Sequence, residues 1–129
     1  MGQPAARQGD KVVATDTHLI QPPGPTSPVT VPHPFSGILD GGLSGNVTIN
    51  GRAAATMDST ATNTPPHIPI GGTFVNPPSN RATVISGSGT VTINGKAAAR
   101  AGDTARTCND PVDLPVGTVV AAGTVTIGG

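Results

Sequence analysis

The segment GNVTINGRAAA occupies residues 45–55 and returns, almost unchanged, as GTVTINGKAAA at residues 89–99. In both copies Val-Thr-Ile alternates apolar and polar side chains, the pattern of a strand with one buried face. An Asn-Gly pair follows, and both of its residues accept a positive φ, which is the strongest short signal for a hairpin turn. Each copy therefore predicts a small β-hairpin followed by closely packed alanines. The turn residues are Asn50, Gly51, Asn94 and Gly95.

A third copy of this unit is divided between the two ends of the chain. Residues 123–129 repeat the strand and the turn, and residues 3–7 repeat the segment that follows the turn. The third unit is complete only if the C-terminus lies beside the N-terminus. We therefore expect a closed body with threefold pseudo-symmetry and adjacent termini, an arrangement that limits exposed sheet edges.

Composition and length favour one all-β domain. The chain has 129 residues, which predicts a single domain, 1–129, with no fused effector domain. It contains 13 Val and 8 Ile against 4 Leu, a bias towards strands, and no segment has helical apolar spacing. Proline-rich connectors separate the repeats, and we expect them to be stiff extended loops or turns outside the sheet interior. The repeat segments are 123–129 with 3–18, 45–67 and 89–108, and the connectors are 21–34, 65–78 and 111–115.

The charge balance and the sequence of the first residues argue against several classes of function. Lys and Arg total 7 and Asp and Glu total 7, so the chain lacks the basic surplus that phosphate binding needs, and we expect no nucleic-acid partner. No apolar run approaches a transmembrane span, and the first residues lack the basic and apolar regions of a secretory signal. A single cysteine cannot form an internal disulfide.

Three histidines and one cysteine lie in or beside the proline-rich connectors. We count from the residue that directly follows each run of alanines. His18 and His67 each lie eleven positions after that residue in their copies, and Cys108 lies eight positions after it in its copy. Pseudo-symmetry would bring these three together near the vertex of a cone, with His33 as the natural fourth ligand. Three imidazoles and a thiolate suit a closed, tetrahedral, structural Zn²⁺ site, with iron as the alternative metal. The spacings match no local metal motif, so solvent-exposed loop histidines and a buried cysteine stay an open alternative.

Two of the alanine segments belong to a longer sequence motif. Pro-Ala-Ala-Arg is followed by Gly-Asp near the N-terminus, and a near-complete second version follows the second Asn-Gly turn. These residues resemble the PAAR-repeat proteins, which cap type VI secretion spikes and have relatives in phage tails and extracellular contractile injection systems. The motif residues are Pro4, Ala5, Ala6, Arg7, Gly9 and Asp10 in the first version and Arg100, Gly102 and Asp103 in the second.

The resemblance implies a fold, a partner and a metal site. The expected fold is a cone of three β-hairpin repeats, with one zinc ion near the vertex held by His18, His33, His67 and Cys108. The expected role is structural, with one otherwise monomeric chain sharpening a trimeric VgrG-type spike for membrane piercing and carrying effectors on its outer faces. Cytoplasmic assembly followed by ejection with the spike is implied too. The tip of a phage tail or of an extracellular injection system is the alternative.

Other readings of the same residues stay open. The middle copy has Thr56 where the others have Arg and lacks Gly-Asp, so the Arg–Asp pairs either contact a spike or stabilise turns internally, and we favour the internal role. A small zinc hydrolase would need three ligands and a general base, for which Asp16 or Asp110 are the candidates because the chain has no Glu. A free-standing adhesin or binding module is the third reading. We expect no enzymatic activity.

Overall fold

β-Strands joined by turns and loops build the computed structural model, which describes residues 2–128 and has no helix among them. Accordingly, no described helix is long and apolar enough to cross a membrane. Gly129, the last residue of the predicted third copy, lies outside the described residues. The longer strands are β2 (Lys11–Gln21), β3 (Val29–Gly41), β6 (Thr60–Asn63), β8 (Arg81–Val84), β11 (Thr104–Thr107) and β12 (Leu114–Val120). The two-residue strands are β1 (Gln3–Pro4), β4 (Thr48–Ile49), β5 (Arg52–Ala53), β7 (Thr73–Phe74), β9 (Thr92–Ile93), β10 (Lys96–Ala97) and β13 (Thr126–Ile127).

The longer strands close into an antiparallel barrel. Their order is β12-β11-β8-β6-β3-β2, and β12 pairs back onto β2, so the sheet has no free edge at this level. Closure removes the unpaired backbone groups that make an open sheet prone to aggregation. The barrel encloses the main core, whose largest buried apolar side chains are Val12, Phe35, Leu39, Val84 and Val119.

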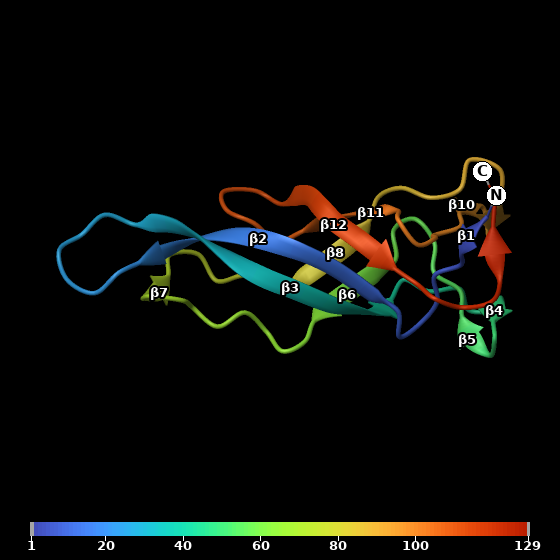
Figure 1. Ribbon diagram of the computed structural model, residues 1–129, viewed down its shortest axis with the longest axis horizontal. Coiled ribbons are helices and arrows are strands. Elements are labelled where there is room, and N and C mark those ends of the chain that lie inside the picture. Colours follow the sequence, from blue (N-terminus) through green and yellow to red (C-terminus); the bar gives the residue numbers. More distant parts are fainter. Residues whose placement is uncertain (1, 129) are drawn as a thin grey trace.

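The molecule is elongated and ends in two different ways (Figure 1). At one end lie the short hairpins and both chain termini, and at the other the long β2–β3 hairpin projects with β7 beside it. His18 pairs with Val31, and the hairpin continues to the pair Ile20–Val29 before its loop begins. The predicted all-β cone is therefore confirmed, and its tip is one extended hairpin rather than three converging ones.

The first proline-rich connector differs from the prediction. Pro32 and Pro34 lie inside β3, where they pair with Thr17 and Thr15 of β2. Two residues further on, the backbone N–H of Ser36 points away from β2 and donates to the Asn63 side chain. Backbone N–H groups two residues apart on a strand point to the same side, so the N–H at positions 32 and 34 would also face away from β2. A proline at these positions therefore removes no hydrogen bond to β2. β6 pairs with β3 only from Gly37 onwards, which leaves that side of β3 free.

The wide end has the predicted threefold arrangement. Its three hairpins are β4–β5, β9–β10 and β13–β1, and the last one joins the two ends of the chain through the pair Gln3–Ile127. Asn50 has φ 51° and Asn94 has φ 52°, and each is followed by a glycine of positive φ, as the Asn-Gly signal predicts.

A ring of backbone hydrogen bonds between three alanines joins the copies. The N–H of Ala6 donates to Ala99 O at 2.9 Å, Ala99 donates to Ala55 O at 3.1 Å, and Ala55 donates to Ala6 O at 3.0 Å. All three alanines are fully buried, so a larger side chain would push the ring apart. Below the ring, Ile49, Ile93 and Ile127 form a second apolar cluster with Ala5, Ala54 and Ala98.

The turn after each alanine run is preserved in the middle copy with different residues. Asp58 has φ 78° and takes the place of Gly9 (φ 90°) and Gly102 (φ 89°). Ser59 takes the place of the aspartate, because its Oγ accepts the N–H of Thr56 at 2.9 Å. The Gly-Asp that the sequence lacks here is thus replaced by Asp-Ser in the same turn.

The Arg–Asp pairs of the other two copies make internal contacts. Asp10 Oδ2 accepts the backbone N–H of Arg7 at 3.0 Å, and Asp103 Oδ2 accepts that of Arg100 at 2.7 Å. The guanidinium of Arg100 also donates to Asp103 Oδ1 at 3.1 Å, whereas Arg7 Nε lies 3.8 Å from Asp10 Oδ2. These carboxylates therefore cap their own turns.

Candidate metal centre

Four elements supply the side chains of the candidate site. His18 comes from β2 and His33 from β3, so the hairpin pairing brings both to the same region. His67 lies in the connector between β6 and β7, and Cys108 directly follows β11. The structure thus brings the four predicted residues to one place in the half of the molecule away from the termini, although their assignment as ligands stays a prediction.

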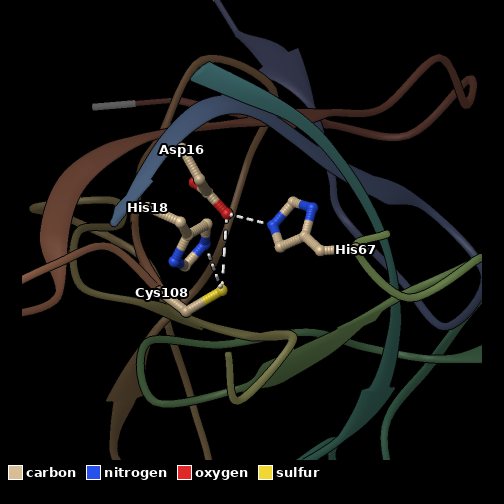
Figure 2. Close-up of side chains that lie close together, drawn as sticks. All are labelled: Asp16, His18, His67 and Cys108. Carbon is tan, nitrogen blue, oxygen red and sulfur yellow. Dashed lines mark hydrogen bonds and ion pairs between the residues drawn. The ribbon is translucent and has the colours of Figure 1, made fainter. Parts of the chain in front are cut away.

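A tight group of donors forms where Asp16 joins three of these residues (Figure 2). The potential ligand atoms of Asp16, His18, His67 and Cys108 all lie within 4.8 Å of one another. Asp16 Oδ2 is 2.8 Å from His67 Nε2 and 3.4 Å from Cys108 Sγ, and Cys108 Sγ is 3.8 Å from His18 Nε2. The four side chains are buried, so this group can hold a metal ion away from solvent.

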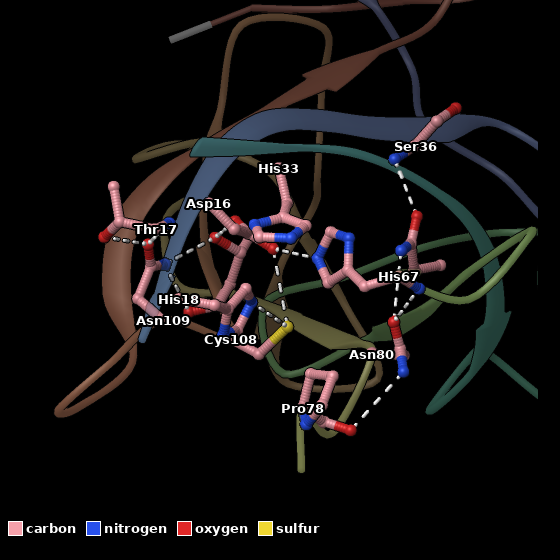
Figure 3. Close-up of polar contacts among 12 residues, drawn as sticks. Asp16, Thr17, His18, His33, Ser36, His67, Pro78, Asn80, Cys108 and Asn109 are labelled. Carbon is pink, nitrogen blue, oxygen red and sulfur yellow. Dashed lines mark hydrogen bonds and ion pairs between the residues drawn. The ribbon is translucent and has the colours of Figure 1, made fainter. Parts of the chain in front are cut away.

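His33 lies beside this group without belonging to it. Its ring centroid is 5.5 Å from that of His18 and 5.6 Å from that of His67 (Figure 3). The Nδ1 atom is 2.9 Å from the carbonyl oxygen of Val31, which orients the ring. Its Nε2 atom is buried and has no hydrogen-bond partner among the described residues. A buried, unpaired imidazole nitrogen is costly in an apolar setting, and a metal ion would satisfy it.

Asp16 is the residue that sequence reasoning did not place among the ligands. Its side chain is completely buried, and its Oδ1 accepts a hydrogen bond from Thr107 Oγ1 at 2.5 Å. The available signal was strand alternation, because Asp16 and His18 stand two residues apart and so share one face of β2. A charged residue on the inward face of a strand is rare unless it is paired or binds a metal.

Amide and carboxylate groups behind the site hold its backbone in place. Asn109 Oδ1 accepts the N–H of Thr17 at 2.7 Å, and Asn80 Oδ1 accepts the N–H of His67 at 2.8 Å (Figure 3). Asp110 Oδ2 accepts the N–H of Leu19 at 2.8 Å and lies 3.4 Å from His18 Nδ1. Such outer contacts orient metal-binding imidazoles, and here they leave His18 Nε2 facing the cysteine.

Burial sets the protonation of the site before any cation is present. Desolvation lowers the pKa of His18, the nearby His67 lowers it further, and Asp110 opposes both effects. Burial raises the pKa of the Cys108 thiol from 9.0 to about 11, and the charge of Asp16 adds to the shift. Without a metal the group therefore holds a neutral imidazole and a protonated thiol, so metal binding must release the thiol proton.

The donor set fits a borderline-soft divalent ion. Imidazole nitrogens together with one thiolate suit zinc, and a carboxylate oxygen is an accepted ligand as well. The unpaired Nε2 of His33 adds a fifth candidate donor next to the group of four. A bound ion would link β2, β3, the 64–72 connector and the segment after β11, which are distant in the sequence.

Comparison with known proteins identifies one part of the chain. A family model, the PAAR motif, matches residues 75–129. The matched segment contains the second alanine repeat, the Arg100–Asp103 turn and Cys108. No curated protein and no solved structure matches the chain.

Proposed function

Because a model of the PAAR motif matches residues 75–129, we propose that this chain caps and sharpens the trimeric VgrG-type spike of a type VI secretion system. The resemblance to PAAR-repeat proteins implies a structural spike tip, so we propose no enzymatic activity for this chain. One chain sits on one spike, assembles with it in the cytoplasm, and leaves the cell with it. Effectors that travel with the spike attach to the outer faces of the tip.

The threefold base is the observation that carries this proposal. Three hairpins from one chain surround the alanine ring, and their isoleucines Ile49, Ile93 and Ile127 are 8%, 8% and 7% exposed. Three near-identical environments let a single chain present the same surface to each subunit of a threefold partner. The blunt end of a β-helical trimer has unpaired strand edges, and such a cap would cover them.

The opposite end has the composition of a surface that enters a membrane. Residues 17–35 and 64–80 contain no Lys, Arg, Asp or Glu. Ile68 is 72% exposed and Ile70 49% exposed, and Val29 beside the tip loop is 47% exposed. Charged side chains cost several kcal/mol in the hydrocarbon region, on the order of 2.5–3.5 kcal/mol each, so their absence supports a piercing role.

A zinc ion held by His18, His33, His67 and Cys108 stabilises this narrow end in our proposal. The metal staple substitutes for a large apolar core, which a hairpin of this width cannot provide. A catalytic zinc needs an open position for water, whereas the donors here are buried. Burial therefore favours a closed, structural site over the hydrolase reading.

Co-purification with a trimeric β-helical spike protein tests the capping role. Native mass spectrometry should find one copy of this chain per spike trimer. Val125→Asp places a charge on the base hairpin, where Val125 is 41% exposed, and should abolish the complex. Val116→Asp, on β12 where Val116 is 45% exposed, is the matched control and should leave the complex intact. A complex that survives Val125→Asp but not Val116→Asp would contradict binding through the base.

A further inference from the structure

The pseudo-threefold base places an arginine side chain against the neighbouring hairpin turn at two of three equivalent positions. In the first, Arg7 Nη1 donates to Asn50 Oδ1 of the next copy's turn at 3.0 Å. The guanidinium also lies against Gly123, where an added Cβ would come within 3.3 Å of Arg7 Cζ. In the second, Arg100 Nη1 lies 3.5 Å from the carbonyl oxygen of Gly128, the corresponding turn residue.

The third position has a threonine and a hollow. Thr56 stands where the other copies have Arg7 and Arg100, and its side chain cannot reach the next turn. A hollow of about 490 Å³ lies there instead. Thr56, Asn94 and Gly45 line this hollow, and they are the repeat counterparts of Arg7, Asn50 and Gly123. The space therefore corresponds to the one that a guanidinium group fills in the first position.

The hollow retains the hydrogen-bond acceptor that an arginine would use. Asn94 Nδ2 donates to Asn46 Oδ1 at 2.9 Å, which fixes the orientation of the Asn94 amide. Asn94 Oδ1 accepts the hydroxyl of Ser44 at 2.6 Å and has a second lone pair. At the corresponding turn position, the backbone carbonyl oxygen of Gly128 lies 2.7 Å from Ser88 Oγ and 3.5 Å from Arg100 Nη1. A serine and a guanidinium thus share this acceptor in one copy already.

A nearby cation does not exclude a guanidinium. Lys96 lines the hollow, and its Nζ lies 3.8 Å from Asp58 Oδ2. Its counterpart in the first position is Arg52, which lies close enough to Gly9 that an added Cβ would come within 3.2 Å of Arg52 Nη1. The first position therefore accommodates two arginines, Arg7 and Arg52. Their counterparts in the third position are Thr56 and Lys96.

We propose that this hollow, which we call the Thr56 socket, binds the guanidinium group of an arginine side chain presented by a partner chain. A guanidinium offers five N–H donors in a planar fork, which suits an amide oxygen set into a hollow. The socket would make one of the three faces unique. On a threefold spike it would engage the arginine of one subunit and leave those of the other two free, and this last consequence alone rests on the proposed function.

NMR titration of the ¹⁵N-labelled protein with methylguanidinium tests the socket without any spike. We expect saturable shifts of the Asn94 side-chain amide and the Thr56 backbone amide. Contacts between the ligand methyl group and the Thr56 methyl group should appear in nuclear Overhauser spectra of the wild type. Methylammonium has the same charge without the planar fork, so it should give neither effect.

Two variants give opposite expectations. Thr56→Arg supplies the missing side chain from within and should remove the shifts at Asn94. Arg7→Thr opens the first position and should add a second set of shifts at Asn50. Absence of saturable shifts at Asn94 in the wild type, equal shifts with methylammonium, or shifts that persist in Thr56→Arg would each overturn the proposal. A spike complex that forms normally while the titration fails would overturn the socket and leave the capping role intact.

Discussion

Replacing Asp16 by asparagine is expected to weaken metal binding about 10- to 100-fold while leaving one ion per chain. Asp16 is completely buried and lies against both His67 and Cys108. With a divalent ion bound, the Cys108 thiolate and the Asp16 carboxylate would make the buried group electrically neutral. Asp16→Asn keeps the shape of the side chain and removes one negative charge beside the ion, which leaves Asp110, next to His18, as the nearby carboxylate.

The magnitude follows from the charge balance. A unit charge about 4 Å from another interacts by about 4 kcal/mol at an effective dielectric constant of 20. Much of this gain is offset because the wild-type carboxylate also loses its hydration on burial. The net electrostatic gain that is left is comparable to the usual cost of removing an outer contact from a metal site, about 1.4–2.8 kcal/mol. This cost corresponds to the expected 10- to 100-fold loss in metal affinity.

Competition against a chromophoric zinc chelator measures the affinity, and native mass spectrometry measures the number of ions. His33→Ala removes a proposed ligand and should lose the ion under conditions where Asp16→Asn retains it. Asp40→Asn is the control, because Asp40 lies on the exposed face of β3 and should not change the affinity. An ion lost from Asp16→Asn but kept by His33→Ala would show that the carboxylate, not His33, is the fourth ligand. Unchanged affinity in Asp16→Asn would refute the charge-balance argument.

Three further measurements test the base and the site. Ile49→Ala and Ile93→Ala should each cost about 2–3 kcal/mol and agree within about 0.5 kcal/mol, because the two isoleucines occupy equivalent buried positions. Urea unfolding followed by circular dichroism suits a chain without Trp or Tyr, and a difference above about 1.5 kcal/mol would contradict the symmetry. Asp58→Gly should not destabilise the fold, since glycine accepts the φ of 78°, whereas Asp58→Val should cost about 1–3 kcal/mol in the same assay. The raised pKa of Cys108 stabilises the metal-free fold below pH 9, and this contribution of about 1–3 kcal/mol should vanish as the pH rises from 9 to 11; chelator-treated Cys108→Ser should lack that loss.

The hairpins of the base were predictable because their information is local. Alternating Val-Thr-Ile and an Asn-Gly turn specify a two-strand hairpin within a few residues, and φ values of 51° at Asn50 and 52° at Asn94 agree with it. The divided third copy was predictable for the same reason. Two half-units with unsatisfied hairpin partners complete each other only if the chain ends meet, as the pair Gln3–Ile127 does.

The turn of the middle copy could not be predicted from the motif letters, because different residues can adopt the same backbone conformation. Asp58 adopts the positive φ of a glycine and Ser59 supplies the oxygen of an aspartate, so the motif letters change while the hydrogen bond persists. Pro32 and Pro34 were misjudged for a related reason. A proline is excluded from a strand only where its N–H is needed, and that depends on which neighbour the strand has on each side.

By itself, the sequence determined the three repeats, the all-β class, the meeting of the termini and the set of histidines and cysteine near one another. Only the tertiary structure decided that β12 closes the barrel onto β2, that Asp16 joins His18, His67 and Cys108, and that a hollow remains beside Thr56. Strand and turn preferences act over a few residues, and a repeat can be counted along the chain. Closure of a barrel, the meeting of side chains 92 residues apart such as Asp16 and Cys108, and the shape of a hollow depend on how distant segments pack, which no local pattern records.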